Sequence, residues 1–392
     1  MYDLARGGIM KKSVIILFTF LIFISWQLYA QTWSSSKRLT WNPGYSESAV
    51  IAAEYLNSLH VVWFEDISGN YEIFYKRSTD SGTTWSGPTR LSWTAENSEA
   101  PSLAVDSCSR VHVVWFDETP GNWEIFYKRS TDNGATWAAP TRMTWTSNHS
   151  CNASISIGLQ NRVHVAWYES TSGSDYDIFY KRSTNGGTTW LAPARLTWNL
   201  GYSFSPAIAA DSGSRVHLVW KDDTPGNFEV FYKRSNDMGV SWSAPARLTW
   251  SSGDVINLFL AVDSSDRIHL VYNDDTPGNR EIYYKSSSDN GASWSAPKRL
   301  SWNSGHSYKP NAAVDLYDTV HVVWYDITIE PTEIFYKNST DLGATWSAIT
   351  RLTWNSGYSQ APSIAADQNG DLHLVWDDGT SGNQEIYYKN RK

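Results

Sequence analysis

Acidic residues recur along this 392-residue chain in two sets of seven, and carboxylates at such regular spacing can act as acids, bases or turn caps. The first set is Glu65, Asp117, Glu169, Asp222, Asp274, Asp326 and Asp378. The second set is Glu72, Glu124, Asp177, Glu229, Glu281, Glu333 and Glu385. Glycoside hydrolysis needs two carboxyl groups roughly 5–10 Å apart in different environments. Seven similar environments do not separate an acid from a base, so we expect both sets to cap turns and to pair with Lys76 and its equivalents.

Histidines recur at the same interval, which raises the question of a metal site. They are His60, His112, His164, His217, His269, His321 and His373. One histidine per repeat makes a ring too wide to converge on a single ion, so we expect buried, hydrogen-bonded structural histidines. The sequence contains no ordered ladder of calcium ligands, no nucleophile elbow and no phosphate loop. We therefore assign no metal, no cofactor and no catalytic residue.

Three sequence frames repeat about every 52 residues and contain 20 of the 22 tryptophans, counting Trp33 as the last residue of a truncated third frame. Arg-Leu-Thr-Trp and its variants begin at Arg38, Arg90, Arg142, Arg195, Arg247, Arg299 and Arg351. His-Val-Val-Trp and its variants begin at the seven recurring histidines. Ser-x-Asp-x-Gly-x-x-Trp and its variants span 78–85, 130–137, 183–190, 235–242, 287–294 and 339–346. Such regular self-similarity indicates a repeat architecture with seven units.

Each repeat is expected to form four short strands bounded by turn residues. In the second repeat these strands span 101–106, 110–115, 124–129 and 140–145. Four-stranded units of this length indicate an all-β fold, a seven-bladed β-propeller of four-stranded antiparallel blades. The chain begins with a fourth-strand segment ending at Trp41 and finishes with a third strand over 385–389. The N-terminal strand is therefore predicted to complete the last blade and close the ring.

The Ser-x-Asp-x-Gly-x-x-Trp segments resemble the Asp-box, the bacterial neuraminidase repeat of sialidases and other secreted propellers. The resemblance implies that the box acid caps a turn on the face away from an active site. These acids are Asp80, Asp132, Asp237, Asp289 and Asp341, and Asn185 takes the place of the acid in the third repeat. Sialidases also carry an arginine triad, whereas fifteen of the 18 arginines here lie in recurring frames. Only Arg280 is expected in a loop on the opposite face, so the triad is missing.

Residues 1–30 have the pattern of a secretory signal peptide, with Lys11 and Lys12 before an apolar run and Ala30 at a small-residue cleavage site. We expect cleavage, a single propeller domain over 31–392 and a secreted, periplasmic or cell-surface protein without a membrane span. An uncleaved signal anchor is the alternative. The net charge of −8 and the pI near 5.6 argue against a nucleic-acid partner. We expect a monomer, and we expect Cys108 and Cys151 to lie on opposite faces, too far apart for a disulfide.

Ligand-binding residues are expected where the repeats differ, in loops predicted to surround the mouth of the central channel. The fourth residue after each Arg-Leu-Thr-Trp frame is Tyr45, Asn97, His149, Tyr202, Asp254, His306 or Tyr358. Two residues further come Glu47, Glu99, Cys151, Phe204, Ile256, Tyr308 and Gln360. Except for Cys151 and Ile256, these residues are candidate ligand contacts, together with Arg280 and Glu169. Drift in exposed loops explains the variation equally well.

The sequence favours a secreted propeller that binds a ligand, with a carbohydrate as the expected partner. The recurring Trp, Arg and acid in every repeat also suggest equivalent sites between blades, as in propeller lectins, by analogy at the level of the fold. A sialidase-like exo-glycoside hydrolase is the alternative, which the missing arginine triad disfavours. An extracellular protein-interaction scaffold is a third hypothesis, for which the sequence has no distinguishing feature.

Overall fold

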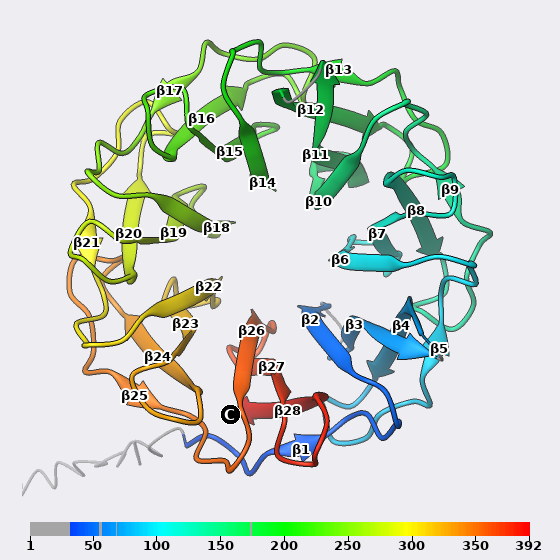
Figure 1. The fold of residues 1–392 in the computed structure, drawn as a ribbon, viewed down its shortest axis with the longest axis vertical. Helices are drawn as coiled ribbons and strands as arrows, with labels where there is room; N and C mark the ends of the chain where they lie inside the picture. The colour runs from blue at the N-terminus through cyan, green and yellow to red at the C-terminus, as the bar shows by residue number, and fades with distance from the viewer. Residues whose placement is uncertain (1–31, 55–56, 68, 173–174) are drawn as a thin grey trace, which may run out of the picture. The chain divides into compact units, whose positions relative to one another are not determined.

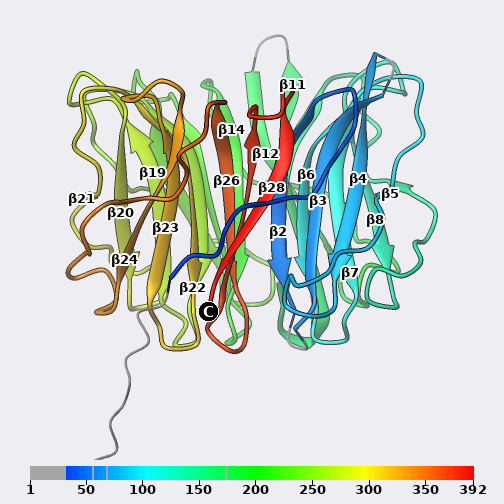
Figure 2. The ribbon, with the colours of Figure 1, turned by 90° about the horizontal axis from the view of Figure 1, so that it is seen from below.

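The computed structural model describes residues 32–54, 57–67, 69–172 and 175–392. They form seven four-stranded antiparallel sheets around a central axis, which confirms the predicted seven-bladed β-propeller (Figure 1). Within the described part of the chain, the short 3-10 turn η1 (Leu159–Asn161) is the one helical element. Figure 2 shows the sheets standing upright around the axis. The predicted signal peptide lies outside the described residues.

The inner two strands of each blade border the channel and the blade core, and we number the blades 1 to 7 by their inner strands. The inner strands are β2 (Ser46–Ala53), β6 (Ser98–Val105), β10 (Ser150–Gly158), β14 (Ser203–Ala210), β18 (Val255–Val262), β22 (Ser307–Val314) and β26 (Ser359–Ala366). The second strands are β3 (Leu59–Ile67), β7 (Val111–Asp117), β11 (Arg162–Ser172), β15 (Val216–Asp222), β19 (Ile268–Asp274), β23 (Val320–Asp326) and β27 (Leu372–Asp378).

The outer two strands of each blade lie toward the rim of the ring. The third strands are β4 (Asn70–Ser78), β8 (Glu124–Ser130), β12 (Asp175–Ser183), β16 (Glu229–Ser235), β20 (Glu281–Ser287), β24 (Glu333–Ser339) and β28 (Glu385–Arg391). The outer strands are β5 (Thr89–Arg90), β9 (Thr141–Arg142), β13 (Ala194–Arg195), β17 (Ala246–Arg247), β21 (Lys298–Arg299), β25 (Thr350–Arg351) and, for blade 7, β1 (Lys37–Arg38).

The outer strands are much shorter than the sequence predicts. In blade 2 only Thr141 and Arg142 pair with β8, although the predicted strand spanned 140–145. The Met143 amide still donates to the Ile125 carbonyl at 2.7 Å, but the Ile125 amide donates to the Thr144 hydroxyl oxygen at 2.9 Å. A side chain thus replaces the next backbone bond of the ladder, so the strand ends early.

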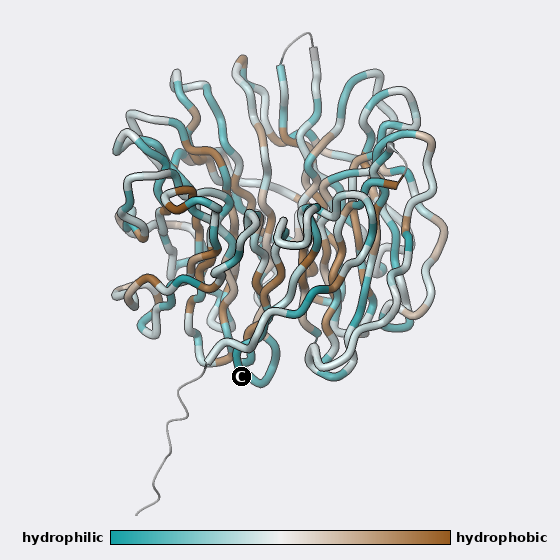
Figure 3. Tube along the Cα trace, turned by 60° about the horizontal axis from the view of Figure 1, so that its bottom comes forward, coloured by the Kyte–Doolittle hydropathy of each residue, from teal (hydrophilic) through white to brown (hydrophobic). Residues whose placement is uncertain are grey.

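The hydrophobic core lies between neighbouring blades, where the second strands are almost fully buried. All seven residues of β7 are buried, and Figure 3 shows apolar bands along the blades. Each Ser-x-Asp-x-Gly-x-x-Trp turn adds an aromatic contact across the same boundary, because its tryptophan packs edge-on against a tyrosine of the preceding blade. Trp137, for example, lies 4.9 Å from Tyr75, centroid to centroid. These contacts stack the blades in a fixed order.

The acid in each of these turns caps its own loop. The Thr84 amide donates to Asp80 Oδ1 at 2.8 Å, and the Ser78 hydroxyl donates to the same oxygen at 2.8 Å. These hydrogen bonds favour the ionised carboxylate and lower the pKa of Asp80 to about 2. In blade 3 the Asn185 side chain makes the same bond to the Thr189 amide at 2.9 Å.

The recurring histidines are buried and hydrogen-bonded, as predicted. His112 Nδ1 lies 2.7 Å from the Tyr127 hydroxyl, and its Nε2 lies 3.3 Å from Asp106. Burial lowers the pKa of His112, which favours the neutral ring. In blade 3 Gly158 occupies the position that Asp106 has in blade 2, so this position offers His164 no carboxylate. Burial lowers the pKa of His164 to about 3. Both cysteines are free, with Cys108 exposed and Cys151 buried.

The ring is closed by β1, which pairs with β28 and completes blade 7 as predicted. The buried Glu385 of β28 accepts hydrogen bonds from Arg38 at 2.5 Å, from the Thr40 hydroxyl and from the Asn42 amide at 3.2 Å. The Leu39 amide adds a bond to the Ile386 carbonyl at 2.7 Å. The two ends of the described chain are thus held together by backbone pairing and by one buried carboxylate.

We predict that Glu385→Gln lowers the free energy of unfolding by about 3–5 kcal/mol, because it breaks a buried ion pair. Glu229→Gln removes the equivalent pair with Arg247 in blade 4 and is the matched control. Both variants should lose similar stability in urea titrations. Hydrogen exchange should speed up at residues 37–41 only in Glu385→Gln, because Glu385 holds β1 on blade 7. Glu229 holds a different outer strand, β17, which a loop also connects to β16. Equal protection of 37–41 in both variants would contradict this account of closure.

Candidate functional site

The mouth of the central channel is shaped by an irregularity that recurs in every inner strand. Near the start of each inner strand, the register of its pairing with the second strand shifts. In blade 1 the shift lies between Glu47 and Val50. The residue that follows the position of Glu47 in each blade forms a ring around the channel, which we call the lining ring. The lining ring consists of Ser48, Ala100, Asn152, Ser205, Asn257, Lys309 and Ala361.

Six members of the lining ring have left-handed backbone, with φ between 43° and 54°. Such a conformation costs roughly 1 kcal/mol or more at a non-glycine residue and often marks functional sites. At the seventh, Asn257, the backbone amide donates to the Asn273 side chain at 2.7 Å. The strained ring encloses a cavity of about 320 Å³, and a second cavity of about 400 Å³ continues below it along the channel.

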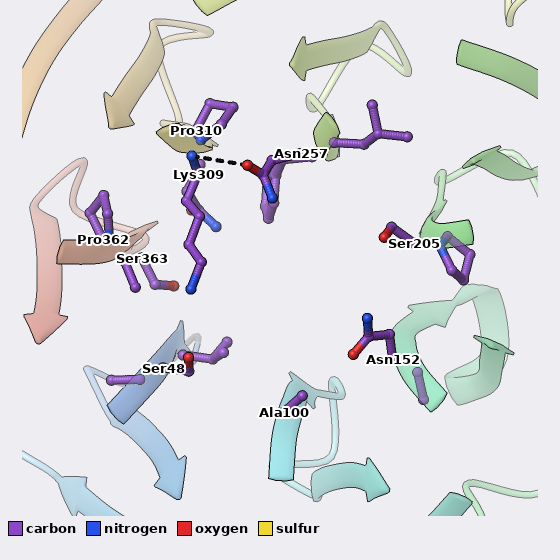
Figure 4. Close-up of a pocket in the computed structure, with 17 residues that line it drawn as sticks. Ser48, Ala100, Asn152, Ser205, Asn257, Lys309, Pro310, Pro362 and Ser363 are labelled. Atoms are coloured by element: carbon purple, nitrogen blue, oxygen red, sulfur yellow. Dashed lines mark hydrogen bonds between the residues drawn. The ribbon is translucent and has the colours of Figure 1, made fainter. Parts of the chain in front are cut away.

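Lys309 is the one charged side chain among the residues that line the mouth cavity. Figure 4 shows its side chain reaching from β22 into the opening, toward Ser363 and Ser48. Its backbone amide is 3.4 Å from the Asn257 side-chain oxygen. Lys309 was not among the predicted ligand residues, which lie one and three positions before it in the repeat, at Tyr308 and His306. A comparison at the next position would have found a single lysine among small and amide residues.

Four of the predicted ligand residues hold neighbouring loops together. The side chain of each accepts a hydrogen bond from a backbone amide of the preceding blade, 26 residues earlier in the chain. The four pairs are Asn97 with Tyr71 at 3.0 Å, His149 with Trp123 at 3.2 Å, Asp254 with Phe228 at 2.9 Å and His306 with Arg280 at 3.0 Å. Tyr45 and Tyr358 at the equivalent position are about half exposed.

The other predicted residues lie directly behind the lining ring, at the start of the inner strands. Glu47, Glu99, Phe204, Tyr308 and Gln360 pair with residues of the second strands. None of them lines the cavity itself. They set the charge and the aromatic character of the wall instead, and they do so differently from blade to blade.

Blades 3 to 6 contribute cations and aromatic rings to this wall, a region we call the aromatic arc. Phe204 lies 5.6 Å from Tyr202 and 4.8 Å from Tyr176, centroid to centroid. The Lys221 ammonium lies 5.7 Å from the Phe204 ring, and burial lowers the pKa of this lysine. The aromatic arc therefore combines flat apolar faces with a partly desolvated cation.

Arg280 extends the aromatic arc into blade 6. Its guanidinium lies 5.1 Å from the Tyr308 ring and donates to the Tyr308 hydroxyl at 3.1 Å. Tyr308 in turn lies 5.3 Å from Tyr325, centroid to centroid. The next residue in the chain is Lys309, which belongs to the lining ring. Arg280, predicted from its isolated position in the sequence, is thus joined to a cluster that approaches the channel mouth.

Blades 7, 1 and 2 add carboxyl groups to aromatic pairs such as Phe64 with Tyr71, a region we call the acidic arc. Burial raises the pKa of Glu47, and the charge of Lys309 acts in the opposite direction. Burial also raises the pKa of Glu99, with smaller contributions from the charges of Glu118 and Glu47. Asp377 accepts hydrogen bonds from the Ser48 amide at 2.9 Å and the Ala49 amide at 3.4 Å, and burial raises its pKa to about 7. The mouth is therefore polarised across its diameter.

Glu169 lies away from the mouth cavity, in the first recurring set of acids. It accepts bonds from the Trp167 indole at 3.0 Å and the Ser150 hydroxyl at 3.3 Å. Burial raises its pKa, opposed by these hydrogen bonds. Other members of the set make the same indole bond and also cap the following turn, as Asp222 does for the Thr224 amide at 3.0 Å.

The second set of acids pairs with arginine, and the expected pairing with Lys76 and its equivalents is wrong. The Glu72 carboxylate binds Arg90 of the outer strand at 2.6 Å, whereas Lys76 donates to the Leu39 carbonyl of the preceding outer segment at 2.5 Å. Strand direction explains the difference, because Glu72 and Lys76 lie at opposite ends of β4. In the described part of the chain, no cluster of three or more His, Cys, Asp or Glu side chains is placed to hold a metal ion.

Solved structures with the same fold are numerous, although their sequences differ widely from this one. A polysaccharide lyase of family PL25, an ulvan lyase bound to -[GlcA(1-4)Rha3S]-, is 10% identical, covers 88% of this chain and 93% of its own, with a TM-score of 0.63. An α-L-arabinanase from Penicillium chrysogenum, complexed with arabinobiose, is 18% identical over 75% and 92% of the two chains, with a TM-score of 0.54. The Hadza microbial sialidase Hz136 is 13% identical over 87% and 74%, also with a TM-score of 0.54.

These similarities define the class of fold, a β-propeller shared with carbohydrate-active lyases, hydrolases and sialidases. No protein-family model matches the chain, and no curated protein matches it. In the part of the chain that the structure describes, no helix has the length and apolar character needed to cross a membrane.

We predict that Asp377→Asn stabilises the protein at pH 8 but not at pH 4. The folded state keeps the Asp377 proton up to about pH 7, whereas the unfolded chain loses it near its ordinary pKa of 3.8. The free energy of unfolding therefore falls as pH rises between these values, by about 4 kcal/mol in total. Urea unfolding of both proteins at pH 4, 6 and 8 checks this.

An amide is expected to fit at this position because blade 5 already has one. The buried Asn273 occupies the equivalent position and accepts a hydrogen bond from the lining-ring amide of its own blade. Asn273→Gln is the control for a change at the same position without a titrating group. A stability difference between Asp377→Asn and the parent that stays constant from pH 4 to pH 8 would argue against a raised pKa.

Proposed function

We propose that this protein is an exported carbohydrate-binding propeller that takes a saccharide at the mouth of its channel. The observation that carries the proposal is the polarised mouth, where the aromatic arc faces the acidic arc across a strained lining ring. Aromatic rings stack on the apolar faces of sugars, and cations and carboxylates orient hydroxyl or acidic substituents. The carbohydrate-active neighbours of this fold support the same class of ligand.

The same proposal includes export through the signal peptide over 1–30 and membership of the Asp-box propellers. The capped turn around Asp80 and its five counterparts supports the Asp-box assignment. The arginines support a site unlike that of sialidases, because those in recurring frames bind structural partners. Arg90 pairs with the buried Glu72, Arg77 donates to the Asn133 carbonyl and Arg110 pairs with Asp106.

A glycoside-cleaving activity is the second candidate, and the acidic arc favours it. Burial raises the pKa of both Glu47 and Glu99, the charge of Glu47 adds to the rise at Glu99, and a raised pKa is what a carboxyl group needs to act as a general acid. Activity would require one of them to protonate a leaving group while the other stays ionised.

We predict that Arg280→Ala and Lys309→Met weaken saccharide binding by about tenfold or more, because each removes a charged hydrogen-bond donor. Binding is measured by titration calorimetry with the best ligands from an array of neutral and acidic glycans. Lys298→Met, on the outer strand β21, is the control and should bind as the parent does. Equal affinity of all four proteins would exclude the mouth as the site.

Catalysis is tested in parallel with aryl glycosides, a fluorogenic sialoside and an acidic polysaccharide. Turnover that Glu47→Gln or Glu99→Gln abolishes, with binding retained, would replace the binding-module proposal by the hydrolase or lyase candidate. Binding without turnover supports the proposal. The absence of both across the array and the panel would favour a protein-interaction scaffold.

A further inference from the structure

Seven tryptophans stand exposed around the outside of the ring, although an arginine of the same frame lies over each indole. Each ends an Arg-Leu-Thr-Trp frame, and we call them the rim tryptophans: Trp41, Trp93, Trp145, Trp198, Trp250, Trp302 and Trp354. Between 59% and 72% of each is exposed, whereas the tryptophans of the second strands are at most 1% exposed. A single exposed indole is ordinary on a protein surface, but an indole at the same position of all seven repeats gives seven equivalent surfaces on which a ligand can stack.

The neighbours of each rim tryptophan hold it outward. In blade 4 the buried Glu229 binds the Thr249 hydroxyl on one side of Trp250 and the Ser251 amide on the other, the latter at 2.7 Å. Because the chain is fastened on both sides of the indole, the side chain between them cannot turn inward. The exposure is therefore built into the blade.

The surface beside the rim tryptophans is hollowed at the boundary between blades. Trp198 lines a cavity of about 350 Å³ together with Trp220, Phe231 and Lys233 of blade 4. One repeat later, Trp250 lines a cavity of about 330 Å³ together with Tyr272, Tyr283 and Lys285 of blade 5. The same positions make the same pocket in consecutive blades, so the pocket belongs to the repeat.

Lys233 and Lys285 line these two pockets, and every blade has a buried lysine at the equivalent position of its third strand. The seven lysines are Lys76, Lys128, Lys181, Lys233, Lys285, Lys337 and Lys389, and each is only 5–8% exposed. Burial lowers the pKa of all seven. An ammonium group has three donors, so its burial is costly unless acceptors surround it.

The acceptors present do not satisfy these ammonium groups. Five of the lysines donate one hydrogen bond, to the carbonyl two residues before the rim tryptophan, as Lys233 does to Leu196 at 2.7 Å. Among the residues that the structure describes, Lys285 and Lys337 have no hydrogen-bond or ion-pair partner, although both are more than nine-tenths buried. The Lys337 ammonium instead lies 4.9 Å from the Trp302 ring.

The nearby carboxylates are already occupied by other groups. In the Trp198 pocket, Asp222 accepts bonds from the Trp220 indole, the Ser203 hydroxyl and the Thr224 amide. The next acid, Glu229, is bound by Arg247. Arg195 and Lys233 already lie over the Trp198 ring, at 6.0 Å and 5.5 Å from its centroid. What remains open to a ligand is the solvent-exposed part of the indole and the N–H donors that the lysine leaves unused, which complement a flat ring bearing a negatively charged oxygen group.

We propose that the seven rim sites, of which those at Trp198 and Trp250 are hollowed into cavities, bind acidic sugar units, one per blade, with the pyranose on the rim tryptophan and its carboxylate or sulfate on the buried lysine. The pockets are separate from the channel mouth, so this inference goes beyond the function proposed above. Seven equivalent sites on one rigid ring let a long acidic polysaccharide engage several at once. The overall affinity then exceeds that of any single pocket without new contacts.

The test uses hydroxyl-radical footprinting with mass spectrometry, which reports the oxidation rate of each tryptophan separately. The probes are tetragalacturonate, which carries carboxylates, a sulfate-substituted galactose tetrasaccharide, and the neutral maltotetraose. At least one acidic probe should slow oxidation of the rim tryptophans and leave Trp85 and Trp137 in the box turns unchanged. The arm that protects identifies carboxylate or sulfate as the recognised group, and maltotetraose should protect neither class.

Lys285→Met then tests the proposed contact within a single molecule. The variant removes the charge but keeps an apolar chain of similar length, so protection of Trp250 should require a roughly tenfold higher probe concentration or more. Protection of Trp198, beside the unchanged Lys233, is the internal control and should stay as in the parent. Lys337→Met, read at Trp302, gives the same test in blade 6 if the first variant fails to fold.

The inference is overturned if no acidic probe protects the rim tryptophans, if maltotetraose protects them equally, or if Lys285→Met leaves Trp250 protection unchanged. Arg280→Ala separates it from the channel-mouth proposal. Rim protection that survives Arg280→Ala supports rim pockets that work independently of the mouth. Rim protection that disappears with Arg280→Ala would assign the saccharide to the mouth and overturn the rim sites.

Discussion

The buried carboxylate at the start of each third strand is the interaction on which the architecture depends. In blade 4 Glu229 binds the Arg247 guanidinium, the Thr249 hydroxyl and the Ser251 amide, so one side chain fastens both the two-residue outer strand and the loop beyond it. A strand with so few ladder bonds would otherwise fray. In blade 7 Glu385 does the same for β1 and thereby joins the two ends of the described chain.

Fastening the loop in this way has opposite consequences at the rim and at the channel. At the rim it is repeated seven times and leaves the same tryptophan exposed in every blade, beside a lysine buried with few acceptors. At the channel the loop leads into an inner strand whose backbone is strained at the same position in six of the seven blades, while the side chains change. Because the rim residues are the same in every repeat, they form equivalent sites on the outside of the ring. Because the residues at the channel mouth differ between repeats, they form one polarised mouth.

The polarity of the mouth arises from substitutions at a few positions of a conserved geometry. The residue after the second-strand aromatic is Lys221 in blade 4, Asn273 in blade 5 and Asp377 in blade 7. Asp377 and Asn273 are buried and accept hydrogen bonds from lining-ring amides, whereas Lys221 lies over the Phe204 ring of the aromatic arc. A symmetrical scaffold thus carries an asymmetric electrostatic field.

The sequence by itself determined the blade count, the strand order and the ring closure, because a repeat of constant length with turn residues at fixed offsets permits little else. It also predicted buried structural histidines and identified Arg280 as unusual. Only the tertiary structure decided that acids pair with arginine rather than with Lys76, that Asn97 and His306 brace loops, and that Lys309 lines the cavity. These outcomes depend on a shifted strand register and on contacts between neighbouring blades, and a one-residue shift changes which side chain faces the channel.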